Sequence, residues 1–257
     1  MLARILALAL AIYPALAFAQ SAVLDAFPPG VFQNRAAIDG GGVPPVGPAL
    51  AYIGNVTPAY SSNVATATAA PIGTASSDRL VVVVFYDLIT PAGTVTATVT
   101  IGGVTATVDT IASLHNSTVG IASANVPTGN TANIVVDYNI SSGANGAFDI
   151  YALTGLSSMT AVGSGALAPT LPPPITTTLA TTAGGIVIAG AQQAGGGGAI
   201  TMSGTETYVE DSSFAIASFS SNASSHAIGV GTNSASAVTA NWASSVGALA
   251  IAAVSFR

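Results

Sequence analysis

Two histidines are the side chains of this chain whose chemistry best suits acid–base catalysis near neutral pH. His115 lies in the run LHNST and His226 in the run ASSHA. A serine and an aspartate beside either ring would complete a triad for nucleophilic catalysis. Runs of serine and asparagine are, however, typical of exposed turns, so we expect two solvated loop histidines and no catalytic residue.

Carboxylates offer two further kinds of site. Glu206, Glu210 and Asp211 form a local acidic cluster, and clustered carboxylate oxygens suit Ca²⁺. Their spacing is not that of an EF-hand loop, and Glu206 and Glu210 would share one strand face, so we expect a solvated face and no metal. Asp137 and Asp149 lie in successive predicted strands and would suit glycoside hydrolysis as an acid pair. Positions on outer strand faces account for them equally well.

Aromatic side chains are the candidates for ligand contact. Trp242 is the only tryptophan, and Tyr208, Tyr138 and Tyr151 are the tyrosines that could join it in a sugar-stacking platform. Trp242 and Tyr208 are our candidates for ligand binding. The alternative for Trp242 is a position in the apolar core.

Charged residues make up only 5% of the chain, against about 25% in an average soluble domain. The four basic residues are all arginines and the net charge is −6, which argues against nucleic acid as a partner. The absence of lysine excludes Walker loops and Schiff-base catalysis. The absence of cysteine excludes disulfides and thiolate metal sites. The run GSGALA at 163–168 matches a dinucleotide fingerprint, but prolines follow where a helix is needed, so no cofactor is expected.

The amino terminus has the layout of a secretory signal over residues 1–19. One arginine precedes an apolar run, and small residues stand before a cleavage site that we place after Ala19. The alternative is a retained apolar segment that docks on a partner or a membrane. Residues 20–48 are rich in proline and glycine and predict an extended arm or linker.

Residues 49–257 predict an all-β body, an antiparallel β-sandwich with a jelly-roll-like arrangement. Short apolar runs recur with turn residues between them, and no segment has a sustained helical period. Apolar residues alternate with polar ones, mostly threonines, on both sides of Gly102-Gly103. This pattern predicts a hairpin that pairs Ile101 with Val104, Val99 with Ala106 and Ala97 with Val108.

Three runs are apolar on both faces and predict central strands covered on both sides, at residues 80–86, 186–189 and 246–256. Half-buried strands are expected at 134–140, 148–153, 206–209, 214–219 and 227–230. The proline-rich stretch at 168–175 marks a possible subdivision, although we favour a single sandwich.

Four segments carry a resemblance to a known group of proteins. They are the run SDRLVVVV at 77–84, the hairpin around Gly102-Gly103, the run VPTG at 126–129 and the closing run VSFR at 254–257. Over residues 50–257 the chain resembles β-sandwich proteins of tailed bacteriophages and phage-derived particles, which serve as capsid decorations, head fibres or tail-associated subunits. The resemblance implies function by assembly and contact, and carries over no catalytic residue.

These observations favour a non-enzymatic structural or attachment protein that is repeated on an outer surface, such as that of a phage virion. Its expected partners are copies of itself and neighbouring particle proteins. The alternative is a secreted bacterial adhesin or carbohydrate-binding module that recognises cell-surface glycans. A secreted hydrolase, with His115 or His226 beside an acid in a cleft, is a third hypothesis.

Overall fold

The computed structural model describes residues 47–88, 94–140, 145–168, 173–195, 198–216, 220–242 and 247–257. Within these ranges the chain forms antiparallel β-strands and no helix, which confirms the predicted all-β, sandwich-like class. The same ranges therefore contain no helix that could cross a membrane. The structure does not describe residues 1–46. The predicted signal at 1–19 therefore lies outside the described residues, as does the predicted arm at 20–48 except for its last two residues.

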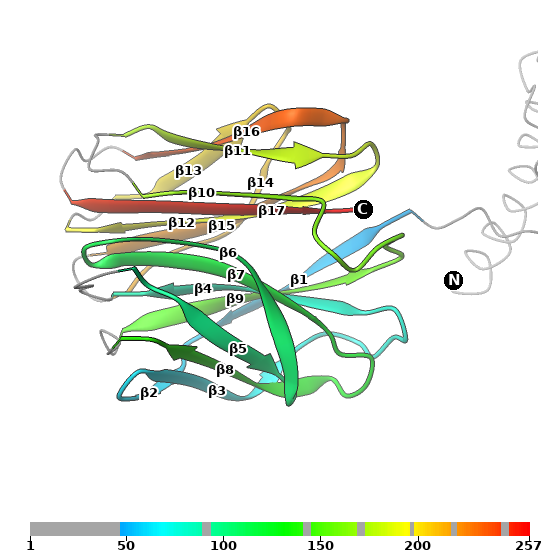
Figure 1. Ribbon diagram of the computed structural model, residues 1–257, viewed down its shortest axis with the longest axis horizontal. Helices are drawn as coiled ribbons and strands as arrows, with labels where there is room; N and C mark the ends of the chain where they lie inside the picture. Colours follow the sequence, from blue (N-terminus) through cyan, green and yellow to red (C-terminus); the bar gives the residue numbers. More distant parts are fainter. Residues whose placement is uncertain are drawn as a thin grey trace, which may run out of the picture. The chain divides into compact units, whose positions relative to one another are not determined.

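The strands form four stacked layers, drawn in Figure 1 from layer 1 at the bottom to layer 4 at the top. Layer 1 contains β2 (Ala59–Ser61), β3 (Val64–Pro71), β5 (Ala97–Ile101) and β8 (Thr131–Tyr138). Layer 2 contains β1 (Ala49–Val56), β4 (Leu80–Asp87), β6 (Val104–Leu114), β7 (Ser117–Asn125) and β9 (Gly146–Thr154). Layer 3 contains β10 (Gly163–Leu167), β12 (Gly185–Ala194), β14 (Val209–Ala215), β15 (Ser220–Val230) and β17 (Ala248–Phe256). Layer 4 contains β11 (Ile175–Thr181), β13 (Ile200–Gly204) and β16 (Asn233–Trp242).

Layers 1 and 2 are two halves of one nine-stranded sheet, in the order β1-β9-β4-β7-β6-β5-β8-β3-β2. Strand β6 joins the halves because its first residues pair with β5 and the remainder pairs with β7. The predicted pairs Ile101–Val104 and Val99–Ala106 are confirmed. The predicted pair of Ala97 with Val108 is wrong, since Val108 pairs with Ala122 of β7 just before a bulge.

Three apolar cores separate the four layers, and strand β4 shows how the sequence builds two of them. Val81, Val83 and Phe85 face the first core, between layers 1 and 2. The alternate residues Val82 and Val84 face the second core, between layers 2 and 3. This alternation explains the run that is apolar on both faces, because successive strand residues point to opposite sides of a sheet. The third core lies between layers 3 and 4.

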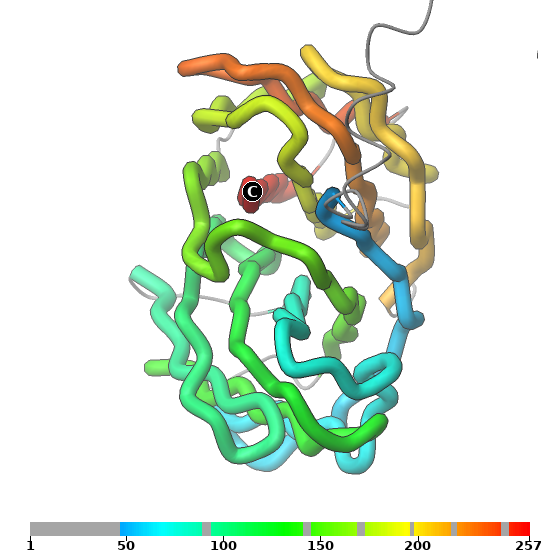
Figure 2. The backbone as a smooth tube through the Cα atoms, turned by 90° about the vertical axis from the view of Figure 1, so that its right-hand side faces the viewer, coloured from blue at the N-terminus to red at the C-terminus, as the bar shows by residue number. Residues whose placement is uncertain are grey.

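The other two doubly apolar runs also form central strands, as predicted. Strand β17 lies between β10 and β12, and β12 lies between β17 and β15. Figure 2 shows the red C-terminal strand in the middle of the stack. The strand expected to be half-buried at 148–153 belongs to β9, whose residues are buried through Leu153, because layers 1 and 3 cover its two faces.

The chain passes from layers 1 and 2 to layers 3 and 4 between β9 and β10. The proline-rich stretch at 168–175 lies between β10 and β11, which belong to layers 3 and 4. Gly163 and Gly165 of the GSGALA run explain how these two strands approach. A Cβ atom at either position would lie 2.5 Å and 2.3 Å from the carbonyl oxygens of Ala180 and Thr178, respectively. The glycines therefore serve close packing of β10 on β11.

A buried arginine, Arg79, connects two loop segments of the chain by hydrogen bonds. The side chain of Arg79 is 0% exposed and makes hydrogen bonds only to backbone carbonyls in the described structure. Its Nη1 donates to Gly73, and its Nε and Nη2 donate to the 126–129 turn. Burial lowers the pKa of Arg79, although the guanidinium stays protonated at any physiological pH.

Candidate functional site

A buried carboxylate links layers 2 and 3. Asp149 of β9 is 0% exposed, and its Oδ1 accepts hydrogen bonds from Tyr52 Oη and Asn55 Nδ2, both at 2.9 Å. Its Oδ2 accepts a hydrogen bond from Ser212 Oγ at 2.6 Å and lies 3.2 Å from Tyr86 Oη. These partners come from β1, β4 and β14, so the Asp149 side chain connects β9 with three other strands across two layers.

The tyrosines of this group are hydrogen-bond donors at neutral pH. Burial raises the pKa of Tyr52 and Tyr86, and the nearby charge of Asp149 raises both pKa values further. The Tyr86 hydroxyl also lies 3.0 Å from the carbonyl oxygen of Ala223, so it shares its proton between two acceptors. These hydrogen bonds fix the side chains of layers 2 and 3 relative to one another.

A second polar pair lies at the same junction between layers 2 and 3. His226 Nδ1 lies 2.8 Å from both carboxylate oxygens of Asp211, and the two side chains are 14% and 5% exposed. Tyr151 Oη donates to Asp211 Oδ2 at 2.9 Å. The prediction of a solvated loop is therefore wrong for His226, which lies in β15 and pairs with the neighbouring strand β14. No serine hydroxyl bonds to His226 among the described residues, so the pair has no nucleophile of a triad beside it.

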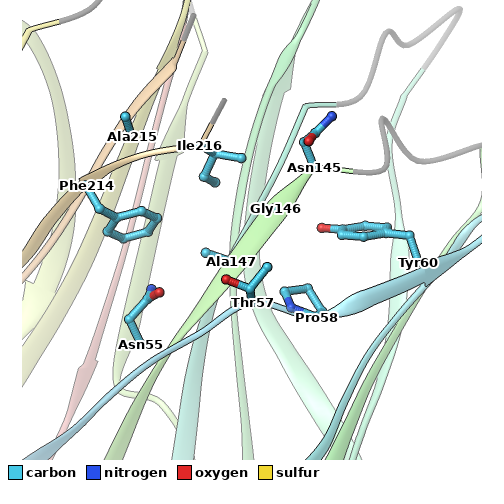
Figure 3. A pocket seen from close by; sticks show the side chains of 10 residues that line it. All are labelled: Asn55, Thr57, Pro58, Tyr60, Asn145, Gly146, Ala147, Phe214, Ala215 and Ile216. Carbon is cyan, nitrogen blue, oxygen red and sulfur yellow. The ribbon is translucent and has the colours of Figure 1, made fainter. Parts of the chain in front are cut away.

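A pocket of about 230 Å³ opens near this junction. Figure 3 shows side chains from β1, β2, β9, β14 and the turn after β1 around it. Its lining residues are uncharged and are Asn55, Thr57, Pro58, Tyr60, Asn145, Gly146, Ala147, Phe214, Ala215 and Ile216. Asn55 also donates to Asp149, which ties the pocket wall to the buried carboxylate.

The two predicted ligand-binding residues do not line this pocket. Trp242 is 5% exposed and belongs to the third core, and its Nε1 is buried with no hydrogen-bond partner in the described structure. Tyr208 packs partly buried against the same core, and its pKa is raised by burial and by the nearby Glu206 carboxylate. Both rings therefore pack against the apolar core, the alternative that the sequence left open for Trp242.

The remaining candidates are separated by the fold. His115 lies in the exposed turn between β6 and β7, as predicted. Asp137 is exposed on β8 in layer 1 and Asp149 is buried facing layer 3, so these two carboxylates do not form a glycosidase pair. Glu206 precedes β14 and Glu210 lies within it, so they do not share a strand face. Across the described ranges, no group of three or more His, Asp or Glu side chains could hold a metal ion.

The site residues that the sequence did not single out are Asn55, Tyr60 and Phe214. They lie in β1, β2 and β14, so only the stacking of layers 1, 2 and 3 brings them together. The one local signal is Pro58, which lies two residues after the end of β1 and itself lines the pocket. Chemically, the pocket offers aromatic and apolar surface with amide and hydroxyl groups at its margin.

The chain has no match among protein-family models, curated proteins or solved structures. The case for a function therefore depends on the surfaces and the pocket of this structure.

Proposed function

We propose that this chain is a non-enzymatic structural or attachment protein that is displayed in many copies on an outer surface, as a component of a bacteriophage virion. The proposal includes a jelly-roll-like connection of the strands, a signal-like segment at 1–19 and an extended arm at 20–48. Its partners would be further copies of the chain and the neighbouring proteins of the particle.

The observation that supports the proposal is the outer face of layer 4. The outward side chains of its strands are small, β-branched or amide-bearing, and none is charged in the described part of these strands. They are Thr176, Thr178, Ala180, Thr201, Ser203, Ala235, Ala237, Thr239 and Asn241. Thr176 lies opposite Thr239, and their hydroxyl oxygens are 2.9 Å apart.

Layer 1 has an outer face of similar chemistry. Thr66 and Val135 are paired across β3 and β8, and Thr100 pairs with Val135 on its other side. Asp137 is the charged residue on the outward side of β8, and its carboxylate is hydrogen-bonded to Asn63. Because neither face carries much charge, like faces of neighbouring copies can approach with little electrostatic repulsion.

The test is association of the full chain with itself and with particles. We expect light scattering after size-exclusion chromatography to give a mass that rises with concentration, and mass spectrometry to find the chain in purified particles from its source. Thr239→Arg places a charge on the central strand of layer 4 and should reduce self-association. The matched control is Thr160→Arg, at an exposed position before β10. A monomer at every concentration, absent from every particle, would contradict the proposal.

A second candidate function is a secreted adhesin or carbohydrate-binding module. The observation in its favour is the uncharged pocket beside Phe214 and Tyr60, because sugars are bound by aromatic and amide side chains rather than by charge alone. It predicts export of the chain and measurable sugar binding. A flat response across a broad glycan panel would remove its support.

A further inference from the structure

The lining of the pocket, which strands of layers 1, 2 and 3 contribute, has two kinds of surface. Pro58, Ala147 and Ile216 are buried and apolar, and Phe214 is half-buried. The polar groups are exposed and lie on Asn55, Thr57 and Asn145. In Figure 3 the rings of Phe214 and Tyr60 lie on opposite sides of the pocket. Such a site fits a molecule that is apolar on one face and carries several hydroxyl groups around its edge.

The uncharged lining of the pocket argues against phosphate and carboxylate ligands. None of the lining residues that the structure describes is acidic or basic. A phosphate or carboxylate ligand would lose its hydration without gaining an ion pair, which is costly. The pocket therefore suits a neutral molecule, and its volume of about 230 Å³ corresponds to roughly seven or eight water molecules at about 30 Å³ each. This space suits one six-membered sugar ring with its hydroxyls.

Two lining side chains are held in place before any ligand binds. Asn55 must turn its Nδ2 toward Asp149, because a carboxylate only accepts hydrogen bonds, and this leaves Oδ1 as an acceptor on the other side of the amide. Phe214 packs edge-on against Tyr86, with ring centroids 5.7 Å apart and planes at 85°. Side chains fixed in this way lose little conformational entropy on binding.

The hydroxyl of Tyr60 is a polar group enclosed by protein beside the pocket. Tyr60 Oη is buried and has no hydrogen-bond partner in the described structure. Figure 3 shows this hydroxyl pointing from β2 toward the middle of the group of lining residues. A Cβ atom at position 146 would lie 1.9 Å from it, so glycine is required there for the hydroxyl to occupy its place. Burial and the charge of Asp87 raise the pKa of Tyr60, which keeps the proton available for donation.

We propose that this pocket binds one neutral hexopyranose unit of a surface glycan. The Phe214 ring contacts the C–H face of the sugar, and Asn55 Oδ1 accepts a hydrogen bond from a sugar hydroxyl. This inference rests on the proposed attachment function and names its receptor chemistry. A single ring held by few hydrogen bonds predicts a dissociation constant in the millimolar range, with avidity supplied by repeated copies.

In the experiment, the full chain is titrated with four probes, and binding is measured by saturation-transfer NMR and by calorimetry. The probes are methyl α-D-glucopyranoside, methyl α-D-mannopyranoside, methyl β-D-galactopyranoside and methyl N-acetyl-β-D-glucosaminide. We expect saturable binding of at least one probe at a single site. Phe214→Ala should raise the dissociation constant at least tenfold. Tyr208→Ala removes a ring outside the pocket, and its dissociation constant should stay within twofold of that of the original chain.

A second variant tests the site without altering the core. Thr57 is exposed at the pocket margin, and Thr57→Arg should block binding while leaving the melting temperature unchanged. Thr160→Arg is its matched control and should bind the sugar normally. The proposal is overturned if no probe binds, or if Thr57→Arg and Phe214→Ala bind the sugar like the original chain. It is also overturned if the pocket binds an uncharged peptide or a nucleoside and no sugar.

The two proposals fail in different ways. Thr57→Arg should still associate with itself, since Thr57 lies outside the outward face of layer 4. Thr239→Arg should still bind the sugar probe. If the original chain associates with itself but binds no sugar probe, only the pocket assignment is overturned. If the original chain binds a sugar probe but does not associate, only the display function is overturned.

Discussion

Arg79 and Val126 are joined by two hydrogen bonds, since the Nε and Nη2 atoms of the arginine donate to the same carbonyl oxygen at 2.8 and 2.6 Å. Nη2 also donates to the carbonyls of Thr128 and Gly129, at 2.9 and 2.8 Å. Two segments that stand out in the sequence, SDRLVVVV and VPTG, therefore meet in the fold through one side chain. The planar guanidinium, with five N–H donors, is suited to such a cluster of carbonyls.

Replacing Arg79 with lysine should destabilise the protein by about 2–4 kcal/mol, because a lysine has three donors on one atom and leaves several buried carbonyls unpaired. Urea unfolding followed by fluorescence measures this change. The control is Arg257→Lys at the exposed C-terminal residue, where we expect a change within about 0.5 kcal/mol. Equal stability of the two variants would show that the carbonyl cluster does not depend on the guanidinium.

The sequence predicted those parts of the fold that depend on neighbouring residues. The turn at Gly102-Gly103 and the doubly apolar strand β4 were predictable because pairing across a tight turn and alternation along a strand are local properties. The full length of β6 was not predictable, because Val108 pairs with β7 instead of β5, next to a bulge that no local sequence pattern indicates. Strand β11 escaped prediction because the run ITTTLAT carries few large apolar residues.

The candidate site was less predictable than the fold for the same reason. Asn55 and Phe214 lie in β1 and β14, and their proximity depends on the stacking of two layers. His226 was assigned to a loop because its neighbours are serines, yet both serines are buried in β15, Ser224 on the side of layer 2 and Ser225 on the side of the third core. In a chain with so little charge, small hydroxyl residues fill buried as well as exposed strand positions, so composition alone does not distinguish them.

Gly190 permits close contact between layers 2 and 3. A Cβ atom at this position of β12 would lie 2.4 Å from Val84 Cγ1 and 3.0 Å from Tyr86 Oη. Gly190→Ala should therefore destabilise the protein by about 1–3 kcal/mol through overpacking. The matched change is Gly231→Ala, where a Cβ atom would have no neighbour within 4 Å. Thermal unfolding should separate the two variants, and similar melting temperatures would show that the layers can move apart at no cost.

Asp149 should be essential to the junction between layers 2 and 3. Asp149→Ala removes the acceptor of Tyr52, Asn55 and Ser212 and leaves these partly buried donors unpaired, so we expect a loss of at least about 3 kcal/mol. Asp149→Asn retains the shape and one acceptor and should lose less. Urea unfolding of both variants gives the comparison. The control is Asp137→Asn on the exposed face of β8, and a loss as large as that of Asp149→Ala there would contradict this account.

The stability of the protein should depend on the ionisation of Asp109, which lies at the bulge of β6. Burial raises the pKa of Asp109 from 3.8 to about 6, with Ser123 as a partly compensating hydrogen-bond partner, and its Oδ2 is buried without a partner in the described structure. Between these two pKa values the folded state holds more protons than the unfolded state. The free energy of unfolding therefore falls as the pH rises through this window and stays lower above it.

Asp109→Asn removes this titration and should stabilise the protein above pH 6, where the aspartate is charged in the folded state. We expect a gain of roughly 1–2 kcal/mol at neutral pH, reduced by the partial exposure of the side chain. The gain should shrink between pH 6 and pH 3.8 and disappear below that range, because both side chains are then neutral. Urea unfolding of the variant and the original chain across this range measures the difference. A difference that does not change with pH would mean that Asp109 has the same pKa in the folded and unfolded states.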